Sequence, residues 1–215
     1  MVIEWLGHSC FKITLKDGTR ILLDPYGSNV GYAPQDVEAD IVTVSHAHGD
    51  HNDLSHVKGD YTVVSAPGVH TFGELKIEGF ETWHDHSQGT HRGRNIIYLF
   101  SVRGIRVCHM GDVGCIPCDD LILKLCGTDV LMIPVGGHYT IDAHEALSIC
   151  ERIEPNIIIP MHFKTPDSNL DIAPLHDFLE AVGREYDVSH HGQCYLTIDK
   201  ASLKKRTRVV VMEYL

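Results

Sequence analysis

Four side chains that commonly bind metal ions fall between positions 46 and 51, directly after an apolar, β-branched run over Ile41–Ser45. They are His46, His48, Asp50 and His51. Imidazole and carboxylate groups are ligands of zinc, iron or manganese. A strand end gives such a loop a rigid base, and Gly49 is expected to permit the tight backbone path that turns the side chains toward one point. The alternative, a solvated turn with coincidental histidines, does not account for this spacing.

Three later segments repeat the pattern of an apolar strand that delivers a ligand-type residue at its C-terminal end. They are Trp83-His84-Asp85-His86, Cys108-His109-Met110-Gly111-Asp112 and Ile159-Pro160-Met161-His162. The chain contains 16 histidines, and this excess also favours a metal centre. One loop seldom fills two metal sites, so we expect these strand ends to bring further ligands to the same edge of the fold.

Hydrophobic patterning predicts a strand-rich first half and alternating helices and strands in the second half. Strands are predicted over Val2–Leu6, Phe11–Leu15, Arg20–Asp24, Ile41–Ser45, Tyr61–Ser65, Leu75–Ile77, Asn95–Val102, Ile105–His109, Val130–Pro134, Ile157–Pro160 and Arg208–Tyr214. Helices are predicted over Asp119–Cys126, Asp142–Ile153 and Ala173–Val182. Asp142 and Glu145 match a capping box at the start of the second helix. This order predicts an α+β fold of two layered sheets with helices outside.

Length and charge exclude several classes of protein. The 215 residues contain no linker-like stretch, which predicts one domain over 1–215. The formal net charge of −11 argues against a nucleic-acid partner, because such binding relies on clustered Lys and Arg. The basic run Lys204-Lys205-Arg206 is therefore expected to be a solvated loop. No apolar run approaches the roughly 18–20 residues needed to span a bilayer, so no membrane partner is expected.

The N-terminus and the cysteines predict a cytoplasmic location. Met1–Trp5 has no basic segment followed by an apolar one, so it does not resemble a secretion signal. The seven cysteines are odd in number and scattered, which favours reduced thiols.

The ligand pattern resembles the metallo-β-lactamase superfamily. His46, His48, Asp50 and His51 match its H-x-H-x-D-H motif, and the later segments follow in the expected order. The resemblance extends from Gly7-His8-Ser9-Cys10-Phe11 to Met161-His162-Phe163. The chain is most similar to small Zn-dependent hydrolases related to the ascorbate-6-phosphate lactonases. The resemblance implies an αββα sandwich with the metals at one edge of two sheets, and possible homo-oligomers, since lactonase relatives are multimeric.

The same resemblance implies a ligand set for two divalent ions, zinc above all, with manganese or iron as alternatives. One ion would take His46, His48 and His84, and the other would take Asp50, His51 and His162. Asp112 would bridge them. A shared hydroxide would then cleave an ester, lactone, amide or phosphoester bond of a small molecule, with Asp50 as the catalytic residue that holds it and moves its proton.

Several nearby histidines have competing interpretations. The motif position favours His84 over His86 as the ligand, and His109 is interpreted as a structural histidine. His8 either orients a ligand or contacts substrate, or else is a buried structural residue. His138 lies in Gly136–Thr140, a glycine-rich loop in which the backbone is expected to approach a ligand closely, and it is therefore a candidate for substrate contact.

Three other functions compete with a small-molecule hydrolase. A phosphodiesterase or nuclease of the same fold would need a basic groove or an added domain. A flavodiiron-type redox enzyme resembles this superfamily too, but it places Glu where His48 stands. A non-enzymatic metal-binding protein would close its metal off from substrate.

Overall fold

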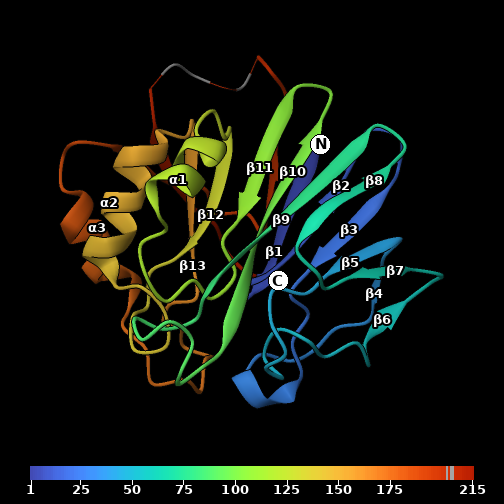
Figure 1. Cartoon of the computed structure of the whole chain (residues 1–215), viewed down its shortest axis with the longest axis horizontal. Coiled ribbons are helices and arrows are strands. Elements are labelled where there is room, and N and C mark those ends of the chain that lie inside the picture. The colour runs from blue at the N-terminus through green and yellow to red at the C-terminus, as the bar shows by residue number, and fades with distance from the viewer. Residues whose placement is uncertain (202, 204–205) are drawn as a thin grey trace.

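The computed structural model describes residues 1–201, 203 and 206–215 and forms two β-sheets packed face to face (Figure 1). The six-stranded sheet has the order β15 (Tyr195–Thr197), β1 (Val2–Gly7), β2 (Cys10–Thr14), β3 (Arg20–Leu23), β5 (Ile41–Thr43) and β7 (Thr62–Val64). The eight-stranded sheet has the order β14 (Asp187–His190), β16 (Arg208–Val211), β13 (Ile157–Met161), β12 (Val130–Pro134), β11 (Ile105–His109), β10 (Arg94–Val102), β9 (Leu75–Trp83) and β8 (Gly68–Phe72). A small third sheet pairs β4 (Val37–Glu38) with β6 (Val57–Lys58).

Three α-helices lie together beside β12 and β13 of the larger sheet (Figure 1). They are α1 (Asp119–Leu125), α2 (Ala143–Ile153) and α3 (Leu175–Val182). Every residue of β12 and β13 is buried, as expected for parallel strands covered on both faces. The capping box predicted at α2 is confirmed, because the Asp142 carboxylate accepts from the Glu145 backbone N–H and the Glu145 carboxylate accepts from the Asp142 N–H.

Alternate residues of the smaller sheet face two different apolar clusters. In β3, Ile21 and Leu23 pack between the two sheets, whereas Leu22 faces the opposite side. That outer side is covered by Val30 of the short 3₁₀ helix η1 (Ser28–Val30) and by Val57 of β6. The predicted α+β sandwich of two sheets is therefore confirmed. Among the described residues, however, the α-helices lie beside the larger sheet, and this 3₁₀ turn and β6 help to cover the other one.

The strand directions bring several strand ends to one edge. In the smaller sheet β2 runs antiparallel to both β1 and β3, and β5 runs parallel to β3, so β1, β3 and β5 share one direction. In the larger sheet β9, β11, β12 and β13 share one direction by the same reasoning. The candidate ligands follow the C-terminal ends of these strands.

The sheets are joined directly where the histidine-rich loop begins. The backbone N–H of Ile96 in β10 donates to the Ser45 carbonyl at 2.9 Å. The Tyr98 hydroxyl of the same strand lies 3.0 Å from the carbonyl oxygens of both Val44 and Val64, from the smaller sheet's side. The loop that carries His46 to His51 is therefore anchored on both sheets.

Lys204 and Lys205 of the predicted solvated run lie outside the described residues. Within the described residues the longest helix, α2, has 11 residues, so no helix there is long enough to cross a bilayer.

Candidate metal centre

The first group of candidate ligands joins the two sheets. His46 and His48 lie in the loop after β5 of the smaller sheet, and His84 follows β9 of the larger one. One ligand atom from each of the three lies within 4.8 Å of the others. His46 and His84 are buried and His48 is exposed. The structure thus assembles the three histidines that the resemblance assigned to one ion, with one of them facing the solvent.

The second group lies beside the first and contains His8 as well as the three expected residues. Ligand atoms of His8, Asp50, His51 and His162 all fall within 4.8 Å of one another. His8 follows β1, and its ring centroid lies 4.3 Å from that of His162. Its Nε2 atom lies 3.5 Å from an Asp50 carboxylate oxygen. Of the two alternatives for His8, the structure therefore supports the one beside the ligands.

The Asp112 carboxylate lies between the two groups. One oxygen is 3.4 Å from His84 Nε2 and 3.2 Å from His162 Nε2, which belong to different groups. The other oxygen is 3.1 Å from His51 Nε2. Asp112 is therefore placed as expected for a residue that would bridge two ions.

Buried polar atoms without hydrogen-bond partners test whether these residues fit a cation. Nε2 of His46, Nε2 of His51, Nε2 of His162 and Oδ1 of Asp112 are buried and make no hydrogen bond to the described residues. Unpaired buried polar groups are costly and call for an explanation. Cations coordinated by these atoms would satisfy them, and imidazole with carboxylate is a suitable donor set for zinc, manganese or iron. The residues fit the metals that the resemblance implies.

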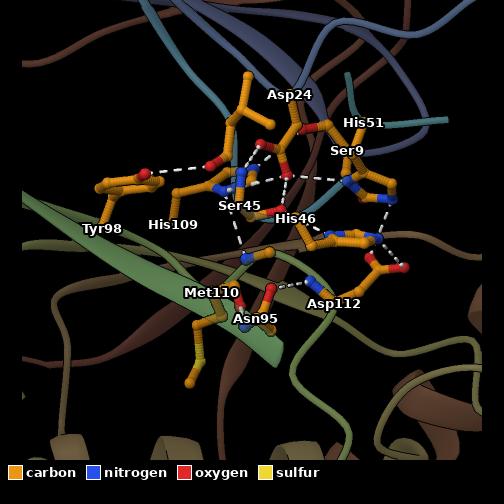
Figure 2. A network of polar contacts seen from close by, with 12 residues as sticks. Ser9, Asp24, Ser45, His46, His51, Asn95, Tyr98, His109, Met110 and Asp112 are labelled. Atoms are coloured by element: carbon orange, nitrogen blue, oxygen red, sulfur yellow. Dashed lines mark hydrogen bonds and ion pairs between the residues drawn. The ribbon is translucent and has the colours of Figure 1, made fainter. Parts of the chain in front are cut away.

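Asp24, which the sequence analysis did not single out, orients one histidine of each group (Figure 2). Its carboxylate accepts the Nδ1–H of His51 at 2.8 Å and the backbone N–H of Ser45 at 2.8 Å. It also accepts the Ser45 hydroxyl, whose oxygen lies 2.9 Å from His46 Nδ1. With both Nδ1 atoms engaged, the Nε2 atoms of His46 and His51 are left for metal. Asp24 also belongs to a third cluster with His46 and His51, but its oxygens are already used by these hydrogen bonds.

Asn95 holds Asp112 in a similar way. Its side-chain oxygen accepts the Asp112 backbone N–H at 2.9 Å, while its amide group donates to the Met110 carbonyl at 2.9 Å. Gly111 makes this close approach possible, because a Cβ there would lie 2.4 Å from the Asn95 oxygen and 2.6 Å from Ser45 Cβ. The turn from β11 to Asp112 is thus fixed against the start of the histidine-rich loop.

The backbone is strained at three residues of the centre. His8, Asp24 and His162 have φ values of 50°, 45° and 51°, in the left-handed region that non-glycine residues seldom adopt. Such conformations cost free energy and concentrate at functional sites. The strain is consistent with side chains held in a required geometry.

The electrostatics favour metal-binding protonation states at most positions. Burial, followed by the charge of His51, lowers the pKa of His46 to about 3, and burial also lowers the pKa of His84. Burial would raise the pKa of Asp112, but the neighbouring histidines hold it well below its usual range. His51 differs: burial lowers its pKa, but Asp112 and Asp24 together raise it well above its usual value. A metal bound there would displace a proton.

Three other histidines are absent from the ligand clusters of the described residues, although His109 Nδ1 lies 4.0 Å from an Asp24 carboxylate oxygen. His86 is exposed and faces Glu145 at 3.7 Å, so the geometry supports the choice of His84. His109 donates its Nε2–H to the Ser9 carbonyl and accepts the Gly111 N–H at Nδ1, which agrees with a structural role. His138 is exposed on its loop and is absent from the three ligand clusters of the described residues, so a substrate contact there stays a prediction.

The sequence-based explanations of two glycine positions were wrong. Gly49 does not have a positive φ, and a Cβ there would meet only Asn29 Nδ2, at 3.7 Å, so the path does not require glycine. Gly136 is required for a different reason than expected. A Cβ there would lie 2.1 Å from the His162 carbonyl oxygen, so the close approach that requires glycine is to the protein's own backbone.

A cleft of about 620 Å³ opens beside the first histidine group. Its lining includes His46 and His48, together with Glu81 of β9, Arg92 of the loop after β9 and Arg94 of β10. A small molecule in this cleft would lie against the candidate metal ligands.

The fold and the site together define a class: an α+β sandwich with a histidine- and aspartate-rich candidate metal centre at the edge of two sheets. The family model described as "Beta-lactamase superfamily domain" matches residues 2–162. The chain belongs to the metallo-β-lactamase superfamily, and the resemblance in its motif is confirmed.

Relatives and solved structures agree with this assignment. A Thermofilum pendens protein is 32% identical over 214 residues, covering 85% of this chain and 92% of the relative. A Thermococcus kodakarensis protein is 31% identical, covering 76% and 84%. Both are named metal-dependent hydrolases. A crystal structure from Thermotoga maritima, described as a Zn-dependent hydrolase of the metallo-β-lactamase superfamily, is 34% identical, covers 100% of this chain and 99% of that one, and has a TM-score of 0.80.

Proposed function

We propose that this chain is a metal-dependent hydrolase that uses two divalent ions, zinc by preference, to cleave an ester, lactone, amide or phosphoester bond of a small molecule. The names of its relatives support the broad activity. The observation that carries the binuclear centre is the position of Asp112, whose one carboxylate oxygen lies within 3.4 Å of a histidine from each ligand group.

The proposed ligands divide as the motif suggested. His46, His48 and His84 would hold one ion, and Asp50, His51 and His162 would hold the other, with Asp112 between them. When bound, such a metal pair polarises a carbonyl or phosphoryl oxygen and lowers the pKa of water toward neutrality. The cleft beside His46 and His48 would admit the substrate.

Asp50 is the proposed catalytic residue. It is the one carboxylate in the histidine-rich loop and is partly exposed, whereas Asp112 is buried. Burial would raise its pKa, but the contact with His8, whose Nε2 lies 3.5 Å away, and the charge of His51 lower it below its usual range. Asp50 is thus an ionised group that can accept a proton from attacking water and deliver it to the leaving group.

The test is the Asp50→Asn variant on a panel of lactones, thioesters, amides and bis-p-nitrophenyl phosphate. We expect activity on any accepted substrate to fall about 10²-fold, the usual scale for a lost acid–base group. Metal held by His46, His48 and His84 should remain, as elemental analysis of the same samples would show. Asp60→Asn removes the same charge from an exposed position and should change nothing. Full activity in Asp50→Asn would contradict the assignment.

A further inference from the structure

Arg92 is a cation in the cleft beside the first histidine group, and it has no acidic partner among the described residues. It lines the cleft together with His46 and His48. Among the residues that the structure describes, no carboxylate lies within 4.0 Å of its guanidinium group. Arg94, two residues on and in the same cleft, differs: it forms an ion pair with Glu81 at 2.8 Å. In a chain of net charge −11, the unpaired cation beside the candidate metal centre needs an explanation.

The loop before Arg92 is held rigidly by Asp85, the residue directly after the candidate ligand His84. The buried Asp85 carboxylate accepts the backbone N–H groups of Ser87 and Gly89 on one oxygen, at 2.7 and 2.9 Å. Its other oxygen accepts those of His91 and Arg92, at 3.0 and 2.8 Å.

The Arg92 guanidinium is also oriented by an aromatic ring. Its central carbon lies 5.1 Å from the centroid of Tyr139. Tyr139 belongs to the loop that packs through Gly136 against the carbonyl of His162. Arg92 is thus held between a segment that follows His84 and one that contacts His162. Contact with the ring uses one face of the guanidinium and leaves its in-plane N–H groups free to bind a planar or tetrahedral oxyanion.

We propose that Arg92 recognises an anionic oxygen group, a carboxylate or a phosphate, on the substrate, at a distance from the bond that is cleaved. The inference rests on the proposed function, because it assigns a substrate class to the same cleft. It makes Arg92 a specificity-determining residue, with Asp85 and Tyr139 as its positioning residues.

The kinetic test compares two esters that differ only in a terminal charge, using zinc-loaded protein. Mono-p-nitrophenyl adipate ends in a carboxylate, and p-nitrophenyl hexanoate ends in a methyl group. We expect wild type to prefer the adipate ester, and Arg92→Met to lower kcat/KM for it about 10-fold or more, mainly through KM, because a charge-assisted hydrogen bond is lost. The kcat/KM for the hexanoate ester should change less than about twofold in the variant, since that ester offers the bond no acceptor. Arg92→Lys should keep part of the preference, because it retains the charge without the planar fork.

Arg103→Met is the matched control and should leave the ratio of the two esters unchanged, because Arg103 is paired with Glu74 and does not line this cleft. A binding measurement separates this inference from the proposed function. Glutarate and methylphosphonate are titrated into zinc-loaded wild type and Arg92→Met, and weaker binding of one or both to the variant supports the inference even if neither ester is hydrolysed. Whichever anion binds wild type more tightly shows whether Arg92 prefers a carboxylate or a phosphate. Equal binding to both proteins, or an equal loss for both esters, would overturn the proposal.

Discussion

At the scale of single residues, Asp24 fixes the geometry of both ligand groups. Its carboxylate binds His51 directly and reaches His46 through the Ser45 hydroxyl (Figure 2). Hydrogen bonds at Nδ1 set which ring nitrogen is free for metal and orient the ring. One fully buried carboxylate therefore orients a ligand of each proposed ion, although both of its oxygens are hydrogen-bonded to protein groups and neither would bind a metal.

We predict that Asp24→Asn weakens metal binding about 10- to 100-fold, the usual effect of losing a carboxylate behind a histidine ligand. The amide is nearly the same size but carries no charge and keeps only one acceptor oxygen. Competition of the variant with a zinc chelator measures the affinity. Asp17→Asn, in an exposed turn where Asp17 accepts the Thr19 N–H, is the control. An unchanged zinc affinity in Asp24→Asn would show that the ligands hold their geometry without it.

Sequence reasoning reached the ligand candidates but not all of the residues that hold them. The candidates His84, Asp112 and His162 could be predicted from the sequence because each follows an apolar run. Asp24 ends one too, Arg20–Asp24, so the same rule could have found it. The hydrogen bonds of Asp85 could not be predicted from the sequence, because its carboxylate binds four backbone N–H groups and backbone groups leave no side-chain pattern.

At the scale of elements, short loops carry the chemistry and regular elements hold them. The loop with Gly136 and Tyr139 runs from β12 into α2, so the start of α2 helps to place Tyr139. There the Asp142 side chain accepts from the backbone N–H groups of both His144 and Glu145, at 2.9 Å. These bonds satisfy two donors that the helix itself leaves unpaired.

We predict that Asp142→Ala lowers the free energy of unfolding by about 1 kcal/mol, the usual cost of losing an N-cap. For a chain of this size the thermal midpoint should fall by roughly 2–4 °C. Circular dichroism during heating measures it. Glu151→Ala on the exposed side of the same helix should have little effect. If the two variants melted alike, the cap would not be contributing.

The elements that the sequence analysis missed are mainly at sheet edges. β8 and β14 form the two edges of the larger sheet, and β15 forms one edge of the smaller sheet. Every residue of β14 is exposed, so it carries no apolar pattern, and its strand conformation comes from pairing with β16. The central strands were predictable because burial leaves a continuous apolar run, as in Val130–Pro134 and Ile157 onward.

At the scale of the whole molecule, the proposed metals would connect the two sheets. His46 and His51 follow a strand of the smaller sheet, and His84, Asp112 and His162 follow strands of the larger one. Ligands that bind only the folded state stabilise it by mass action. Bound metal should therefore stabilise the sandwich as a unit.

We predict that removing metal with a chelator lowers the thermal midpoint by roughly 10 °C. Zinc at about 1,000 times its dissociation constant contributes about 4 kcal/mol, and each kcal/mol corresponds to roughly 2–4 °C in a chain of this size. Differential scanning calorimetry before and after chelation, and again after zinc is restored, measures the shift. An identical midpoint in all three samples would contradict a metal that joins the sheets.

The number of metal ions bound by each chain tests the binuclear centre directly. Protein purified without chelator is titrated with zinc, and its metal content is determined by elemental analysis alongside His84→Ala and His162→Ala. The ligand groups predict saturation at two ions in the parent chain and at one in each variant, since each variant removes a ligand from a different group. Saturation of the parent chain at one ion would contradict the binuclear centre.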